Sequence, residues 1–171
     1  MSSIEHKKMA PVRVSCKVIT VSDTRTADTD KSGRLILSLL EEAGHGAAEY
    51  EIVPDEEMLI KNAAVSGCKA PDIDAVLISG GTGIAKRDVT LEAVSGIFEK
   101  ELPGFGEIFR MLSYQEDIGS AAILSRAAAG TADNTIVFSM PGSTGAVRLA
   151  MEKLILPELG HIVKELKKDL S

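Results

Sequence analysis

The stretch that decides the fold is DAVLISGGTGIAKRDVT, residues 74–90. A run of apolar residues ends at Ser79, and glycines follow at once in a segment that we call the glycine loop. The glycine loop consists of Gly80, Gly81, Thr82 and Gly83. A short apolar run bounded by glycines is typical of a buried strand that ends in a tight turn. This stretch therefore predicts a strand, a loop with accessible main chain, and a helix from about Thr90.

Apolar strands alternate with helical patterns along the whole chain. The expected strands cover residues 12–22, 47–53, 74–79 and 134–140. The expected helices cover residues 32–44, 55–67 and 90–100, most of 103–130, and two C-terminal segments, one capped by Ser143 and one that begins at Pro157. Strands that alternate with helices predict a parallel sheet covered on both faces. We therefore expect an α/β fold with three layers, αβα, and a mostly parallel sheet.

The chain has 171 residues, a length typical of one domain. We expect a flexible tail over residues 1–10 and a single domain over residues 11–171. Cys16 and Cys68 do not make a disulfide framework, and no apolar stretch reaches the ~18 residues of a membrane span. The sequence therefore predicts a cytoplasmic protein with reduced thiols and no membrane partner.

The net charge of −6 argues against nucleic acid as a partner, because neutralising phosphates requires a basic face. A small anionic ligand needs only a local pocket, so this charge leaves such a ligand open. The three histidines, His6, His45 and His161, lack the spacing of metal ligands, and we expect them on the surface.

Polar or glycine-rich residues follow each predicted strand. Ser22 and Asp23 stand at the end of the first strand, and Asp55 follows the second. The glycine loop follows the third strand, and the segment 139–142 ends the fourth. Ligands of open parallel sheets bind outside the carboxyl ends of the strands. We therefore expect these loops to converge on one ligand site at a single edge of the sheet.

The glycine loop is suited to bind a phosphate. Glycines let backbone N–H groups approach an anion closely, and a strand, a glycine-rich loop and a helix in this order are typical of phosphate sites. The loop is no Walker P-loop, and Lys86 stands where a dinucleotide fingerprint would have its third glycine. For the loop taken alone, a purely structural turn is an equal alternative. The turn MPGST, residues 140–144, is a second candidate anion site.

Charged residues beside the glycine loop favour a nucleotide with magnesium. Arg87 is suited to neutralise a phosphate, and Asp88 and Asp55 are suited to hold Mg²⁺ together with phosphate oxygens. Helix capping is the alternative for both aspartates. It explains Asp55 well and Asp88 less well, because Thr90 is the better cap for its helix. Asp23 could face the same ligand or serve as a turn residue.

Seven short motifs resemble one known family. In order, they are TVSDT, VPDE, SGGTG, KRDVT, PGFGEIFRMLSYQEDIG, AILSRAAAG and MPGSTGA. Together they are similar to the MoaB/MogA family of molybdenum cofactor biosynthesis proteins, and the fifth motif resembles the MoaB branch more than the MogA branch. The resemblance extends from about Val12 to the last helix, which is nearly the whole chain.

The resemblance implies adenylylation of molybdopterin, in which the terminal phosphate of the pterin attacks the α-phosphate of Mg-ATP and pyrophosphate leaves. Asp55 and Asp88 match the essential family aspartates, which would hold Mg²⁺ through the nucleotide. The residues that match the nucleotide and phosphate side are Gly80, Gly81, Thr82, Gly83, Ser22, Asp23 and Arg87. The residues that match the pterin side are Thr82, Ser113, Ser125, Ser139, Pro141 and Gly142.

Other functions stay open at this point. A molybdopterin carrier or scaffold with the same pocket would bind the pterin without turnover, whereas an unrelated nucleotide-binding regulator would bind ATP and ignore the pterin. The resemblance also implies a homo-oligomer, a trimer or a hexamer, and a molybdenum-insertion protein as a partner. The apolar residues near Ile108, Phe109 and Met111 are suited to the core or to an interface.

Overall fold

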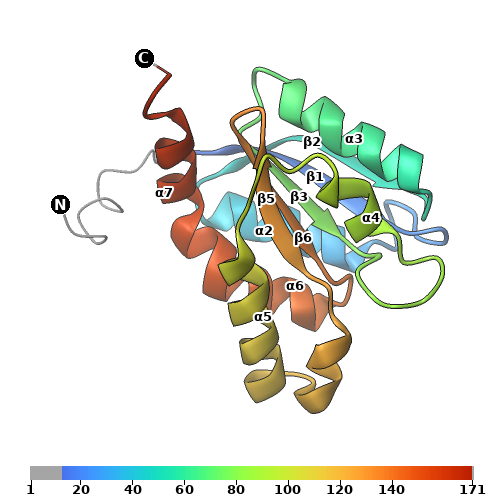
Figure 1. Cartoon of the computed structure of the whole chain (residues 1–171). Helices are drawn as coiled ribbons and strands as arrows, with labels where there is room; N and C mark the ends of the chain where they lie inside the picture. Colours follow the sequence, from blue (N-terminus) through green and yellow to red (C-terminus); the bar gives the residue numbers. More distant parts are fainter. Residues whose placement is uncertain (1–12, 171) are drawn as a thin grey trace.

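The computed structural model describes residues 13–170, so the predicted tail over residues 1–10 lies outside the described residues (Figure 1). One six-stranded sheet runs through the described part in the order β2-β1-β3-β6-β5-β4. Its strands are β1 (Ser15–Val21), β2 (Gly46–Val53), β3 (Ala75–Ser79), β4 (Lys100–Glu101), β5 (Ala128–Ala132) and β6 (Thr135–Met140). The α-helices are α2 (Lys31–Glu42), α3 (Glu57–Lys69), α4 (Thr90–Ser95), α5 (Pro103–Glu116), α6 (Thr144–Ala150) and α7 (Leu156–Lys167). The remaining helical segments are η1 (Gly119–Leu124), a 3₁₀-helix, and η2 (Met151–Ile155), a π-helical segment.

Helices cover both faces of the sheet and form the outer layers of a three-layer αβα fold (Figure 1). On one face, Ile36 of α2, Phe109 of α5 and Val147 of α6 belong to a single hydrophobic cluster. On the other face, Ile60 of α3 and Val94 of α4 belong to a second cluster. Successive residues of a strand point to opposite faces, so the continuous apolar runs of the strands supply both clusters. The predicted fold class is confirmed.

The sheet is mostly parallel and has an antiparallel edge. β2, β1, β3 and β6 pair in parallel, whereas β5 pairs antiparallel with both β6 and β4. The prediction of helix over most of 103–130 is wrong at its end, because β5 begins at Ala128. Asp133 and Asn134 join β5 to β6 with positive φ angles of 50° and 62°, as a type I′ hairpin turn requires. Pairing with β6 thus outweighs the helix propensity of the alanines.

The helix starts confirm one predicted cap and correct two. Ser143 Oγ accepts a hydrogen bond from a backbone N–H of α6 (3.2 Å) and caps that helix as predicted. The prediction of Asp55 as a cap is wrong, because Glu56 precedes α3 and no side chain caps that helix. The prediction of Thr90 as a cap is also wrong, because α4, which is shorter than predicted, begins at Thr90 itself and Val89 precedes it. The Thr90 hydroxyl donates to the Gly80 carbonyl (2.8 Å) and so ties α4 to the glycine loop.

His45 and the two cysteines lie inside the fold. The prediction of a surface position is wrong for His45, which is 9% exposed and whose Nδ1 accepts a hydrogen bond from Val14 N (2.9 Å). His6 lies outside the described residues. Burial raises the pKa of Cys16 to about 12 and the pKa of Cys68 to about 11. Among residues 13–170, no helix is both long enough and apolar enough to span a bilayer.

Lys17 is a buried cation in the middle of β1. Its side chain is 2% exposed, and its ammonium lies 2.9 Å from Glu51 Oε2 and 3.3 Å from Glu49 Oε2 on the neighbouring strand β2. It also donates to the Ala63 carbonyl of α3 (2.9 Å). A buried ammonium has to be paired and hydrogen-bonded, and here it connects two strands and a helix.

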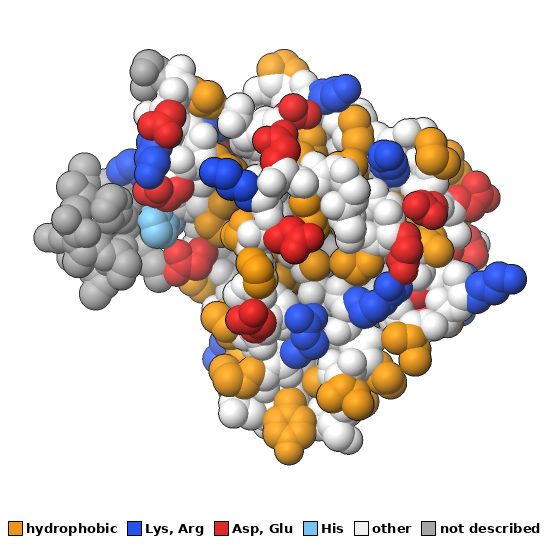
Figure 2. Space-filling model, in the orientation of Figure 1, with side chains coloured by type: hydrophobic (Ala, Val, Ile, Leu, Met, Phe, Trp, Pro, Cys, Tyr) orange, Lys and Arg blue, Asp and Glu red, His pale blue; other side chains and the backbone are white. Residues whose placement is uncertain are grey.

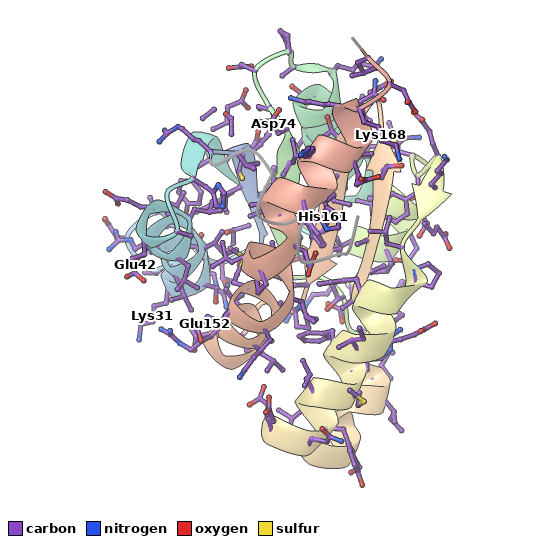
Figure 3. All side chains as sticks on the ribbon, turned by 90° about the vertical axis from the view of Figure 1, so that its left-hand side faces the viewer. Lys31, Glu42, Asp74, Glu152, His161 and Lys168 are labelled. Atoms are coloured by element: carbon purple, nitrogen blue, oxygen red, sulfur yellow. The ribbon has the colours of Figure 1, made fainter. Side chains whose placement is uncertain are left out.

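α7 is attached to the sheet through Asp74, the residue directly before β3. Figure 3 shows His161 and Lys168 along α7, with Asp74 near the C-terminal half of that helix. Asp74 forms an ion pair with Lys167, and its other carboxylate oxygen accepts a hydrogen bond from Ser15 N (3.0 Å). The end of α7 is therefore fixed to the starts of β1 and β3, at the edge of the sheet opposite the loops predicted to bind a ligand.

Candidate functional site

A cavity of about 280 Å³ lies at the carboxyl ends of the parallel strands, where the sequence predicts the site. It is lined by Val21, Ser22, Asp23, Thr24, Arg25, Asp55, Gly80, Gly81, Arg87, Asp88 and Gly142. Loops that follow β1, β2, β3 and β6 thus meet at one edge of the sheet. A larger cavity of about 520 Å³, between α7 and the antiparallel edge, gathers none of these loops.

The first half of the glycine loop brings its main chain to the cavity. Gly80 and Gly81 have φ angles of 101° and 70°, which favour glycine. A Cβ on Gly80 would lie 2.4 Å from the Val21 carbonyl oxygen, and one on Gly81 would lie 2.2 Å from Thr90 Oγ1. Side chains are therefore excluded at both positions, and the backbone of the loop stays accessible from the cavity.

Carboxylates gather on one side of the cavity. Asp23 Oδ1 accepts a hydrogen bond from the backbone N–H of Asp55 (2.8 Å), which joins the loops after β1 and β2. Burial and the neighbouring charge of Asp23 raise the pKa of Asp55, Arg87 opposes this rise, and Asp88 adds to it. The two aspartates predicted to act together, Asp55 and Asp88, therefore face a common space within electrostatic range of each other.

Asp88 is held by its own loop. Its Oδ2 accepts a hydrogen bond from Ala85 N (2.9 Å), and its backbone N–H donates to the Ala85 carbonyl (2.9 Å). A Cβ on Gly83 would lie 2.8 Å from Asp88 Oδ2, so this glycine leaves room for the carboxylate. Thus Gly83 serves the loop by making space for Asp88, and it does not line the cavity.

Arg25 is a cavity residue that sequence reasoning missed. Its Nη2 donates to the Gly142 carbonyl (3.2 Å), and its Nη1 lies 3.8 Å from Asp30 Oδ1. Asp30 is fully buried and also accepts hydrogen bonds from Gly33 N (2.9 Å) and from the Tyr50 hydroxyl (2.5 Å). These bonds hold Arg25 between the loops after β1 and β6, and its partly exposed guanidinium adds a second cation to the cavity beside Arg87.

The residues assigned to the pterin side are only partly brought together. Gly142 lines the cavity together with residues that were assigned to the nucleotide side. Thr82 is buried, and its carbonyl accepts a hydrogen bond from Arg126 N (3.0 Å), which places Ser125 beside the glycine loop. Ser113 is buried on α5, which Arg110 connects to the Ser125 carbonyl (3.3 Å). Thr82 and the segment of Ser125 therefore lie side by side, and Ser113 belongs to the helix that Arg110 joins to that segment, but none of the three lines the cavity.

Ser139 does not reach the cavity. Its side chain is fully buried within β6, and its hydroxyl has no hydrogen-bond partner. Pro141, at the turn that follows, is half-buried and leads the chain into Gly142. A direct contact between Ser139 and a ligand would require the end of β6 to move, whereas the backbone of Gly142 is accessible as it stands.

No group of three or more histidine, cysteine, aspartate or glutamate side chains within residues 13–170 is arranged to hold a metal ion. The cavity instead offers aspartates next to arginines and accessible amides. Such a mixture suits a metal ion that arrives with phosphate oxygens as ligands, because Mg²⁺ is commonly held by one or two carboxylates plus substrate phosphates.

Comparisons with known proteins identify the family of this chain. The model of one family, described as a probable molybdopterin binding domain, matches residues 17–161. Molybdenum cofactor biosynthesis protein B of Bacillus subtilis is 65% identical over 169 residues, which cover 99% of each chain. A protein of the same name from Bacillus cereus is 62% identical over 168 residues, covering 98% of this chain and 99% of the other.

Solved structures show the same architecture. A crystal structure of a molybdenum cofactor biosynthesis protein B superposes with a TM-score of 0.91 at 61% identity, covering 94% of this chain and 99% of the other. The tungsten cofactor synthesizing protein MoaB from Pyrococcus furiosus superposes with a TM-score of 0.81 at 40% identity, with coverages of 92% and 99%.

Proposed function

This chain belongs to the molybdopterin-binding family of molybdenum cofactor biosynthesis proteins, and from that premise we propose that it adenylylates molybdopterin with Mg-ATP. One observation carries the proposal: Asp23, Asp55 and Asp88 meet Arg25 and Arg87 over the accessible backbone of the glycine loop. A site that joins cations, carboxylates and accessible main chain suits a triphosphate better than a neutral ligand. The reaction would take place in the cytoplasm.

In this reaction an oxygen of the molybdopterin phosphate forms a bond to the α-phosphorus of ATP. The bond between the α-phosphorus and the bridging oxygen breaks, and pyrophosphate leaves with that oxygen. Transfer of this kind needs alignment of the attacking and leaving groups and stabilisation of charge at phosphorus, and little covalent help. The Gly81 amide would orient the phosphates, and Arg25 and Arg87 would balance their charge.

Asp55 and Asp88 are the residues that would hold Mg²⁺ together with the triphosphate. Their fit to a cation is supported by the crowding of like charges, since Asp23 and Asp88 both raise the pKa of Asp55. When bound, the ion neutralises the developing charge on the phosphate oxygens. The carboxylates themselves fix where the nucleotide lies relative to the glycine loop.

The pterin would lie beside the nucleotide, toward Thr82, Ser113 and Ser125. Gly142 would contribute through its backbone, with Pro141 shaping the turn. Ser139 would act by supporting this turn from within the sheet, because its hydroxyl is buried. In this proposal the pterin phosphate would lie next to the glycine loop, within reach of the α-phosphate.

The test is release of pyrophosphate from ATP in the presence of molybdopterin and Mg²⁺. The wild-type chain should release pyrophosphate only when both substrates are present. Asp88→Asn should lower the rate by about a hundredfold and keep the fold, because asparagine can still accept the Ala85 N–H. Asp72→Asn, the same change on an exposed turn, is the matched control and should keep the wild-type rate.

Tight binding of molybdopterin without release of pyrophosphate would overturn the adenylylation and support the carrier or scaffold. Binding of ATP that is indifferent to molybdopterin would support a nucleotide-binding regulator. A wild-type rate in Asp88→Asn would remove Asp88 from the mechanism. Thermal melting of each variant separates a loss of fold from a loss of chemistry.

We further propose that the chain forms a homo-oligomer, a trimer or a hexamer. Figure 2 shows hydrophobic side chains gathered over the end of the molecule where α5 and the following segment lie. The exposed apolar side chains of this region are Ile108, Met111, Tyr114, Ile118, Ile123 and Leu124. Phe109 belongs to the core, so only its neighbours are available for an interface. A mass from light scattering tests the assembly, and a molybdenum-insertion protein is the proposed acceptor of the product.

A further inference from the structure

Arg126 binds both ends of the loop that carries Asp88. Its Nε donates to the Gly83 carbonyl (2.9 Å), and its Nη2 donates to the Asp88 carbonyl (2.9 Å). The same guanidinium pairs with Glu92 on α4, at 2.5 Å and 3.3 Å. Its backbone N–H donates to the Thr82 carbonyl (3.0 Å). One residue thus bonds to main-chain carbonyls at three positions from Thr82 to Asp88.

The loop between those ends has little other support. The side chain of Ile84 is 69% exposed, and residues 85–87 are also exposed. Within the loop, the two hydrogen bonds that shape it both join Ala85 and Asp88. An exposed loop with few packed side chains takes its conformation from such hydrogen bonds. The orientation of the Asp88 carboxylate therefore depends on how firmly Gly83 and Asp88 are held.

We propose that Arg126 is a positioning residue that sets the distance between the glycine loop and Asp88. This inference rests on the proposed function, because the position of Asp88 matters only if Asp88 acts on the bound nucleotide. Arg126 does not line the cavity, so it acts through the loop and without touching the ligand. A planar guanidinium can donate to two carbonyls and a carboxylate at once. A lysine ammonium carries the same charge but lacks this fixed fork, and so cannot reproduce the three contacts.

The experiment compares Arg126→Lys and Arg126→Gln with Glu92→Gln. The glutamate variant removes the ion pair and leaves both carbonyl contacts in place. Hydrogen exchange of the Ala85 and Asp88 amides, measured without ligand, reports on the loop alone. The amide of Gly80 donates to the Met140 carbonyl (2.9 Å) at the same edge of the sheet, and its exchange rate serves as the internal reference.

Both arginine variants should speed exchange of the Ala85 and Asp88 amides about tenfold, whereas the Gly80 amide and the Glu92→Gln variant keep the wild-type rate. In pyrophosphate release, Arg126→Lys should lower kcat by about a hundredfold, because misplacement of a reacting group by about 1 Å has this effect. The Mg²⁺ concentration at half-maximal rate should rise in the same variant. The KM for molybdopterin should stay as it is.

Unchanged exchange in both arginine variants would overturn the inference, and so would equal loosening in Glu92→Gln. If Arg126→Gln melts too early to be measured, Arg126→Lys decides the question. The exchange measurement needs no chemistry, so it stays decisive even if the wild-type chain releases no pyrophosphate. A wild-type chain that releases no pyrophosphate would overturn the proposed function and leave the inference on Arg126 to the exchange measurement.

Discussion

The backbone N–H of Asp55 donates a hydrogen bond to the carboxylate of Asp23 at 2.8 Å. This bond connects the loops that leave β1 and β2, two strands that pair in parallel. It means that one acidic residue of the cavity fixes the main chain of another. The carboxylate of Asp55 is therefore placed by a neighbour, and its position does not depend on helix capping, since no side chain caps α3.

Asp23→Ala should displace Asp55 and lower the rate of pyrophosphate release, because the acceptor of the Asp55 N–H is lost. Asp23→Asn keeps an acceptor oxygen and should recover most of the rate. We expect a fall of about tenfold for alanine, with little change in the melting temperature, because a hydrogen bond of this kind contributes about 1 kcal/mol. Equal rates in the alanine and asparagine variants would show that the hydrogen bond does not position Asp55.

Arg25→Gln should weaken binding of Mg-ATP, because it removes a cation that the Gly142 carbonyl holds at the cavity. We expect the KM for Mg-ATP to rise about tenfold, in line with the ~1.5–3 kcal/mol of a hydrogen bond to a charged group. Calorimetric titration with the nucleotide gives the affinity directly. Arg148→Gln, which changes an exposed arginine of α6, is the control and should bind as the wild type does. Unaltered affinity in Arg25→Gln would remove this residue from the site.

His45 should make the fold less stable in mild acid. Burial, followed by the charge of Arg13, lowers the pKa of His45 below its ordinary value of 6.5. The unfolded chain then binds a proton that the folded chain does not, so stability decreases as the pH falls below 6.5. The decrease stops below the lower pKa of the folded state, and one group cannot contribute more than about 1.4 kcal/mol per pH unit.

His45→Asn provides the comparison for this pH dependence. Asparagine can place an acceptor near the Val14 N–H and does not titrate in this range. Urea unfolding at pH 7 and pH 5 should therefore show a smaller loss of stability in the variant than in the wild type. The same loss in both proteins would mean that other groups carry the acid sensitivity.

Lys17→Ala should destabilise the fold by about 3 kcal/mol, because it removes a buried side chain and leaves a cavity. Lys17→Met fills most of that space but leaves the Ala63 carbonyl without its donor, so its cost should be nearer 1 kcal/mol. Unfolding in urea measures both. If the methionine variant loses as much as the alanine variant, the pairing with Glu49 and Glu51 matters more than the packing.

Much of the fold could be predicted because local patterns carry it. The apolar runs of β1, β3 and β6 are buried on both faces and have few polar interruptions. β5 could not be found in this way, since AAGTA has no alternation and its alanines favour helix. Its strand conformation comes from pairing with β6, and the only local sign is the turn at Asp133 and Asn134.

The site residues also divide into those that local patterns could predict and those that distant contacts place. Asp55 and the glycine loop stand directly after apolar runs, and Asp88 lies a few residues farther along the segment that begins with that loop, so the rule that ligands bind at the ends of parallel strands points to them. Arg25 lies in a polar stretch without periodicity, and the contact that holds it lies far away in the sequence. The presence of an arginine in a loop that leaves a strand at this edge is the only signal that could have identified it. Ser139 is the opposite case, a residue that the sequence assigned to the site and that the structure keeps out of it. Its position at a strand end suggests exposure, but the sheet buries it.

The contact between Arg25 and Gly142 joins residues separated by 117 positions. During synthesis, the first of these leaves the ribosome long before the second has been translated. A nascent chain that stops short of Gly142 therefore lacks one wall of the cavity, together with the turn that follows β6. A ligand stabilises only the conformation that binds it. Substrate in the cell can therefore stabilise the complete folded chain against unfolding, but it cannot stabilise a chain whose synthesis stopped before Gly142.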